Sequence, residues 1–191
     1  LRKFFRNDRW QEVISLTAGL LDDLGRKPVT DFLSYLIVKP SLPSRPKPLQ
    51  LSKLNLLIAC LKDKVEPEDF IIDYVRKSLM SFVETSGPFL HRILGSLPQL
   101  GGLAKIPFGS TLIDELENVV KKGKEFARAE SAILVGFNLL KDEQDRARFL
   151  ASAIKTAIVE MPLLSAAAQY VASVLASNAD TGFCDDLTKQ I

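Results

Sequence analysis

The sequence predicts an all-α protein, an irregular α-solenoid of HEAT- or armadillo-like helical hairpins. Apolar residues recur at three- and four-residue steps along most of the chain, which is the period of one helix face. No alternation of apolar and polar residues is long enough to be a strand. Helix pairs of roughly 35 to 45 residues are separated by turns, as in stacked helical repeats. No repeat consensus recurs letter for letter, so an irregular helical bundle is the alternative.

Composition places the chain among ordinary globular proteins. It has 191 residues, of which 47% are hydrophobic and 25% charged, enough to bury a sizeable core. The chain starts at Leu1 without the basic and apolar regions of a secretory signal, and we expect a cytoplasmic fragment truncated at both ends. Cys60 and Cys184 lie in unrelated contexts, so we interpret both as buried thiols in a reducing compartment.

The first predicted helix runs from Asp8 to Gly25. Asn7 or Asp8 can cap its start, and Gly25 can adopt the positive φ that ends a helix. Its apolar residues form one stripe, which we expect to be buried: Trp10, Val13, Ile14, Thr17, Leu20, Leu21 and Leu24. In this interpretation Trp10 is a core anchor, and Gly19 lets another helix approach closely.

The next helices follow short links and one proline-rich loop. Pro28 suits the first turn of a helix to about Val38, with an inward stripe of Phe32, Leu33, Leu36 and Ile37. Residues 39–50 hold four prolines, which exclude helix and central strand. We interpret them as a connector, with an SH3-type ligand as the alternative. The apolar residues of 51–62 cover most of the helix circumference, which predicts a central helix.

A fourth helix is expected to begin at residues 66–68 and to continue to Gly87. Its stripe comprises Phe70, Ile71, Tyr74, Val75, Leu79, Phe82 and Val83. Pro88 then opens a short helix, 89–95, with the only histidine, His91. A single histidine without a partner motif is assigned no chemistry.

The second half of the chain follows a glycine-containing break. We expect residues 1–96 to form N-terminal hairpins, 97–109 a linker whose apolar residues can dock on the helices, and 110–191 C-terminal hairpins. Gly101 and Gly102 are not a phosphate loop, because no strand precedes them and no Gly-Lys-Ser/Thr follows. Ser110 is the predicted cap of the next helix, and Asp142 caps a later one that ends at Pro162.

The start of the chain resembles a segment of a known family. Phe4, Phe5, Arg9, Trp10, Glu12 and the run LTAGLL at 16–21 are similar to the motif that follows the ATPase core in NACHT-type STAND proteins. There the segment joins the nucleotide-binding module to a helical-repeat sensor. The resemblance implies that Trp10, Glu12 and Leu20 couple the sensor to an upstream ATPase domain.

The same resemblance implies a non-catalytic sensor module that recognises a macromolecular trigger and controls the ATPase, in a bacterial signalling protein. ATP and Mg²⁺ are expected only in the missing upstream domain, since this chain has no GxxxxGK[ST] motif. No cofactor, metal or catalytic residues are assigned here, because the acids, such as Asp22 with Asp23 and Asp185 with Asp186, lie at helix or chain ends.

Other classes of function stay open as alternatives. A stand-alone helical adaptor would use the basic N-terminal part, where residues 1–64 carry twelve Lys and Arg against six Asp and Glu, or the proline-rich loop. We do not expect nucleic-acid binding, because basic and aromatic residues do not cluster. Residues 157–177 are about long enough to span a bilayer, but their polar residues and Pro162 favour buried helices, so no membrane partner is expected.

Overall fold

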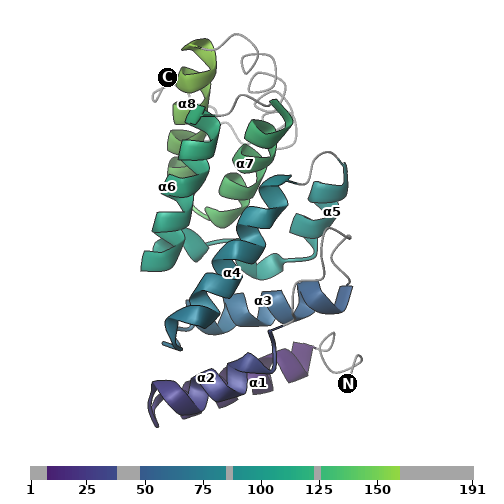
Figure 1. Cartoon of the computed structure of the whole chain (residues 1–191), viewed down its shortest axis with the longest axis vertical. Helices are drawn as coiled ribbons and strands as arrows, with labels where there is room; N and C mark the ends of the chain where they lie inside the picture. Colours follow the sequence, from purple (N-terminus) through teal and green to yellow (C-terminus); the bar gives the residue numbers. More distant parts are fainter. Residues whose placement is uncertain (1–7, 38–47, 85–87, 123–125, 160–191) are drawn as a thin grey trace. The chain divides into compact units, whose positions relative to one another are not determined.

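The computed structural model describes residues 8–37, 48–84, 88–122 and 126–159 (Figure 1). These residues form α-helices and short 3-10 turns and include no strand, which confirms the predicted all-α class. The chain divides into two compact units, one of residues 1–79 with 91–100 and the other of residues 80–90 with 101–191. The stacking of a solenoid stays a prediction, as do the expected boundaries at 96 and 110.

The first unit is organised around one buried helix. Its helices are α1 (Asp8–Asp22), α2 (Arg26–Ser34), α3 (Pro48–Lys62) and most of α4 (Asp69–Ser81). As predicted, α3 is central and is buried on nearly all sides, and its buried residues are Leu51, Leu54, Asn55, Leu56, Leu57, Ile58, Cys60 and Leu61. Helix α1 packs against both α2 and α3.

Polar contacts fix the elements around α3. The Asn55 Oδ1 accepts a hydrogen bond from the Gln99 backbone N–H at 3.0 Å, and the Lys62 Nζ donates to the Gln99 carbonyl oxygen at 3.0 Å. Both bonds hold the 3-10 turn Pro98–Leu100. Thr30 is buried on α2, and its Oγ1 accepts from the Glu68 N–H at 2.8 Å. A buried polar side chain that is hydrogen-bonded in this way avoids the cost of desolvation without a partner.

The second unit is organised around α7 (Phe126–Leu139), which packs with α6 (Pro107–Lys122) and α8 (Glu143–Val159) (Figure 1). Residues 131–136 of α7 are all buried. Small residues make this possible: at Gly136 an added Cβ would lie 2.3 Å from the Phe149 ring. The predicted cap of α8 is confirmed, because the Asp142 Oδ1 accepts hydrogen bonds from the N–H groups of Gln144 and Asp145 at 3.0 and 3.3 Å.

The segment expected to link the halves contains two 3-10 turns, Pro98–Leu100 and Leu103–Lys105. Leu100 and Leu103 are buried, so the expected docking of its apolar residues is confirmed. Gly102 adopts φ 86°, in the left-handed region that favours glycine, and its N–H donates to the Leu139 carbonyl oxygen at 3.0 Å. Residues 101–105 of this segment are therefore packed against the second unit, to which they belong.

Several predicted helix boundaries are wrong. Helix α2 begins at Arg26, because Gly25 with φ 116° separates it from α1, and Pro28 lies in its first turn as predicted. The helix ends at Ser34 rather than near Val38. Helix α3 begins at Pro48, inside the range expected to be loop, because proline is tolerated in a first helical turn. Ser110 is not a cap: α6 begins at Pro107, and the Ser110 Oγ donates to the Pro107 carbonyl oxygen at 2.8 Å.

The remaining helices agree more closely with their patterns. Helix α4 ends at Ser81 and continues as a 3-10 turn, Phe82–Glu84. Helix α5 (Pro88–Gly95) begins at the predicted proline. Phe70, expected in the buried stripe of α4, is 49% exposed, because it lies in the first turn ahead of the buried Ile71. Residues 38–47 of the proline-rich loop, Pro162, Cys184 and Asp185 with Asp186 lie outside the described residues.

No helix among the described residues is long and apolar enough to cross a membrane. Most of the range 157–177, whose length raised that alternative, lies beyond residue 159 and is not described.

Two glycine substitutions test the packing. In α6, an alanine Cβ at position 109 would lie 1.9 Å from the Leu103 carbonyl oxygen, whereas a Cβ at Gly19 in α1 would have no atom of the described residues outside its own helix within 4 Å. We expect Gly109→Ala to lower the free energy of unfolding by about 1–3 kcal/mol. Gly19→Ala should raise it by about 0.5–1 kcal/mol, because alanine favours the helix more than glycine does. Urea unfolding measures both, and shifts of the same sign would contradict this packing.

Candidate protein-docking face on the first helix

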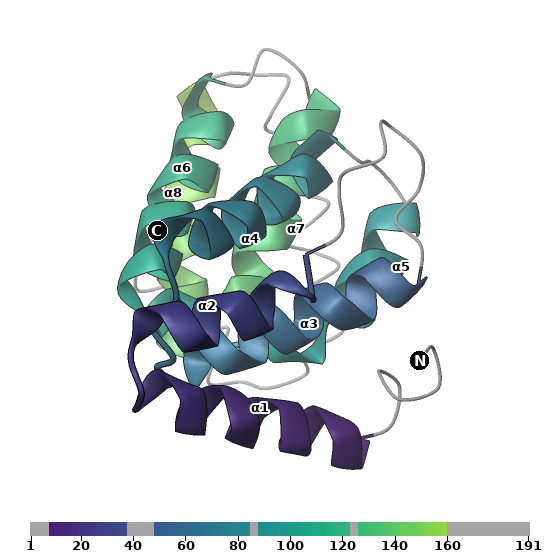
Figure 2. The same ribbon diagram turned by 60° about the horizontal axis from the view of Figure 1, so that its bottom comes forward.

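Helix α1 has two apolar sides, and the described helices cover only one of them. Helix α1 packs against α2 and α3, and its covered side carries the buried Ala18 and the half-buried Ile14 and Leu21. Figure 2 shows α1 with α2 and α3 on one side of it and no described helix over the other. The predicted single buried stripe is therefore wrong, because the apolar residues of α1 divide between two sides.

The second side is exposed and is here called the α1 outer face. Exposed fractions increase along it, and its large residues are Trp10 (43%), Val13 (48%), Leu16 (63%), Leu20 (69%) and, just after the helix, Leu24 (73%). At 100° per residue, the four within α1 lie inside about 120° of the helix circumference. They therefore form one continuous stripe rather than scattered exposed residues.

The three residues singled out from the resemblance all lie on or beside this face. Trp10 and Leu20 belong to the α1 outer face, and Glu12 is exposed near its border. Trp10 is therefore not the buried core anchor that its size suggests. Among the described residues, nothing lies within 4 Å of a Cβ built at Gly19, so they show no close helix contact there. The structure does not describe the side chain of Arg9.

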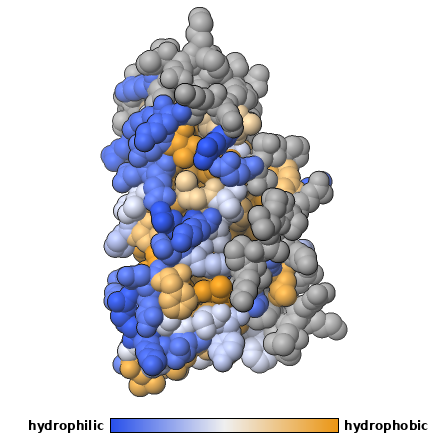
Figure 3. Space-filling model, in the orientation of Figure 1, coloured by the Kyte–Doolittle hydropathy of each residue, from blue (hydrophilic) through white to orange (hydrophobic). Residues whose placement is uncertain are grey.

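Polar contacts on the far side of α1 fix its orientation. The Ser15 hydroxyl donates a hydrogen bond to the Asp63 carboxylate at the end of α3. The Asp22 Oδ1 accepts from the Glu66 backbone N–H at 3.1 Å. These contacts, with the burial of Ala18, hold the helix so that the apolar stripe faces outward. In Figure 3 apolar atoms reach the surface at the lower margin, where Figure 1 places α1 and α2.

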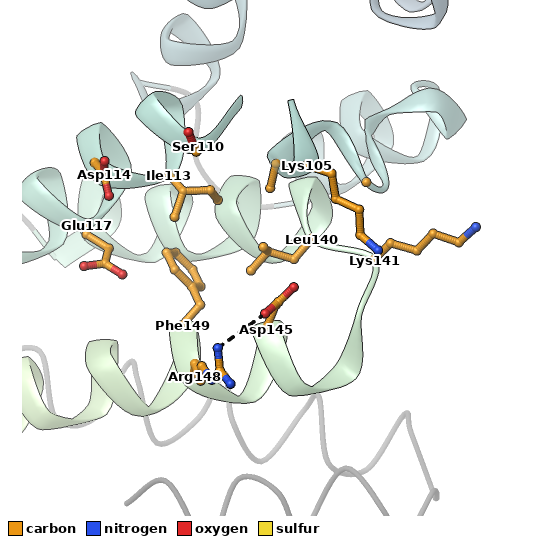
Figure 4. Close-up of a pocket in the computed structure, with 12 residues that line it drawn as sticks. Lys105, Ser110, Ile113, Asp114, Glu117, Leu140, Lys141, Asp145, Arg148 and Phe149 are labelled. Atoms are coloured by element: carbon orange, nitrogen blue, oxygen red, sulfur yellow. Dashed lines mark ion pairs between the residues drawn. The ribbon is translucent and has the colours of Figure 1, made fainter. Parts of the chain in front are cut away.

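The second unit has a surface hollow, with a volume of about 330 Å³, between η4 (Leu103–Lys105), α6 and the start of α8. Figure 4 shows Lys105 and Lys141 at one end and Asp114 and Glu117 at the other, with apolar side chains between them. Arg148 lies 3.9 Å from Asp145, a weak exposed ion pair. Cations and carboxylates are mixed here and all are at least partly exposed, so the hollow selects neither an anionic nor a cationic ligand.

No catalytic grouping stands out among the described residues. They contain no cluster of His, Cys, Asp and Glu suited to a metal, and His91 is exposed. Cys60 is buried, and burial, with a smaller contribution from the negative charge of Asp63, raises the pKa of its thiol to about 12. A protonated, buried thiol is a poor nucleophile.

Comparisons with known proteins add no relative: no family model, curated protein or solved structure matches the chain. The α1 outer face is thus the feature on which a function can be argued. Its exposure could not be predicted from apolar spacing, which is the same for a helix stripe that faces the core and for one that faces a partner.

The apolar side chains of this face should contribute little to the stability of the chain alone. We expect Leu20→Ala to change the free energy of unfolding by no more than about 0.5 kcal/mol. The same substitution at Leu57, which is fully buried in α3, should cost about 2–5 kcal/mol, because it leaves a cavity. Urea unfolding of both variants makes the comparison. A large loss in Leu20→Ala would mean that the outer face is buried in solution.

The raised pKa of Cys60 predicts a loss of stability in alkali. The unfolded thiol has a pKa of 9.0 and the folded thiol one of about 12. The folded chain therefore keeps this proton longer, and its contribution to stability is complete below pH 9.0 and is lost as the pH rises toward 12. Urea unfolding at about pH 8 and about pH 10.5 should show a smaller loss in Cys60→Ala than in the parent chain. Equal losses would argue that Cys60 is not buried as described.

Proposed function

We propose that this chain is a helical protein-interaction module and that the α1 outer face is its docking surface. The observation that carries the proposal is the continuous stripe of exposed Trp10, Val13, Leu16 and Leu20 on a helix that is otherwise well fixed. Exposed apolar stripes of this kind mark sites of protein association, and tryptophan is the residue most enriched at the energetic centres of interfaces.

Following the resemblance of residues 4–21, the protein that docks is the ATPase module of a NACHT-like switch protein. Trp10 and Leu20 then make the apolar contact, and Glu12 borders it. In this scheme the rest of the chain binds a macromolecular trigger, and trigger binding changes how α1 sits on the ATPase. The trigger can shift that equilibrium only as far as it binds one arrangement better than the other.

The alternative is a stand-alone helical adaptor without an ATPase. The same face would then dock an independent protein, and the outcome of the following experiment separates the two. The α1 outer face favours neither partner by its apolar character alone.

The test uses the full-length native polypeptide. If the proposal holds, the reading frame before Leu1 encodes a Walker A motif, and the protein hydrolyses ATP. Trp10→Ala and Leu20→Ala should each change basal ATP turnover by about fivefold or more, because truncating an interface centre costs roughly 1–4 kcal/mol and 1.4 kcal/mol is about tenfold. Tyr35→Ala, at a site that is 80% exposed after α2, is the control and should leave turnover unchanged.

Absence of a nucleotide-binding module upstream would discard the switch and leave the adaptor. Unchanged turnover and unchanged stability in both α1 variants would contradict the role of the face in coupling.

A further inference from the structure

We infer that α1 and α2 form a latched hairpin, residues 8–37, which opens from α3 as one unit while the rest of the chain stays folded. The inference goes beyond the proposed docking function, because it concerns a movement of this chain and holds for any partner. It is carried by the polar contacts of the hairpin with the α3–α4 connection, residues 63–69, and by the small number of apolar side chains buried in the hairpin.

The polar contacts of α1 reach the residues that follow α3. The Ser15 hydroxyl donates to the Asp63 carboxylate, and the Asp22 Oδ1 accepts from the Glu66 backbone N–H at 3.1 Å. Both hydrogen bonds are exposed, and each contributes only modestly because water competes for the same groups. They therefore hold α1 in one position without making its release costly.

Helix α2 is held by the same short connection. The Thr30 Oγ1 accepts from the Glu68 N–H at 2.8 Å, and the Arg26 guanidinium donates to the Pro67 carbonyl oxygen at 2.8 Å and to the Asp69 Oδ1 at 3.0 Å. The side chain of Asp69 is 94% exposed in this ion pair, so water and salt screen it. Because both helices are latched to residues 63–69, release of one favours release of the other.

Fewer large apolar side chains are buried in the hairpin than in the helix that it covers. Among the described side chains of residues 10–37, the buried apolar ones are Ala18, Val29, Leu33 and Leu36. In the shorter α3 they are Leu51, Leu54, Leu56, Leu57, Ile58, Cys60 and Leu61. The free energy of a local opening increases with the apolar surface that it exposes. The hairpin should therefore open more often than α3 unfolds.

Opening would uncover the apolar surface between the hairpin and α3, including the thiol of Cys60. This thiol is buried, is hydrogen-bonded with Ser15 and lies close enough to Asp63 to be influenced by its charge, which places it under α1. A partner that binds the open state better than the closed one would shift the equilibrium, but only as far as its two affinities differ.

Two measurements on the chain with Cys184→Ser, which leaves Cys60 as the only cysteine, test the latch. One is the rate of maleimide labelling of Cys60, and the other is amide hydrogen exchange in α2. Both should proceed faster than global unfolding allows and should depend less on urea, since a local opening exposes less surface. The amides of α3 should exchange more slowly than those of α2.

Ser15→Ala removes one bond of the latch and should speed both measurements about twofold to tenfold, as expected for one hydrogen bond. Thr17→Ala is the matched control on the same helix and should speed neither, because the Thr17 hydroxyl donates to the Val13 carbonyl oxygen of α1 itself at 2.7 Å. Faster exchange in α2, where the substitution changes no atom, would show that the two helices open together.

Labelling and exchange that follow global unfolding in every variant would overturn the inference. Faster labelling of Cys60 in Ser15→Ala without faster exchange in α2 would mean that α1 leaves alone, which would overturn the opening of the hairpin as one unit. Neither result bears on the docking face, which the ATP turnover experiment tests separately.

Discussion

Helix α1 carries more apolar surface than its neighbours can cover. Ala18 is fully buried, and Ile14 and Leu21 are half-buried on the side of α2 and α3, whereas Leu16 and Leu20 on the other side are more than 60% exposed. Removal of apolar surface from water is worth roughly 25 cal/mol per Å². Burial of the exposed side of α1 by a partner would therefore be favourable, and the functional argument depends on this free energy.

The orientation of α1 follows from specific polar contacts together with the burial of Ala18, Ile14 and Leu21. If burial alone decided, Trp10 and Leu20 would face the core, since they are larger than Ala18. The hydrogen bonds of Ser15 with Asp63 and of Asp22 with Glu66 hold the opposite side against the unit. These polar contacts are exposed, so each stabilises only modestly, but together with the close packing at Ala18 they select one rotation of the helix.

Where sequence patterns succeeded, they described local chemistry or complete burial. The residues of 51–62 are apolar around the whole helix, so any neighbour buries them, and α3 is central as predicted. Asp142 caps α8 because a short carboxylate before a helix bonds the first N–H groups wherever the helix packs.

Where the patterns failed, the outcome depended on neighbours distant in the sequence. Trp10 and Phe70 lie at helical spacing with buried residues, but both are exposed. Nothing in their local sequence indicates whether another helix covers them. Prolines made 39–50 look like a loop throughout, although Pro48 begins α3, because a first turn does not need the missing N–H. The resemblance singled out Trp10, Glu12 and Leu20, but the exposure of the α1 outer face could not be predicted, since exposure is set by the packing of α2 and α3.

The proposed function requires that the α1 outer face, which is exposed in this chain, is covered by the ATPase module in the full-length polypeptide. Leu20→Cys provides the measurement, as the rate of maleimide labelling at position 20, followed by peptide mass spectrometry in the isolated chain and in the full-length native polypeptide. Tyr35→Cys is the reference site. The account predicts fast labelling at both positions in the isolated chain and slow labelling only at position 20 in the native polypeptide. Equally fast labelling of position 20 in both proteins would contradict it.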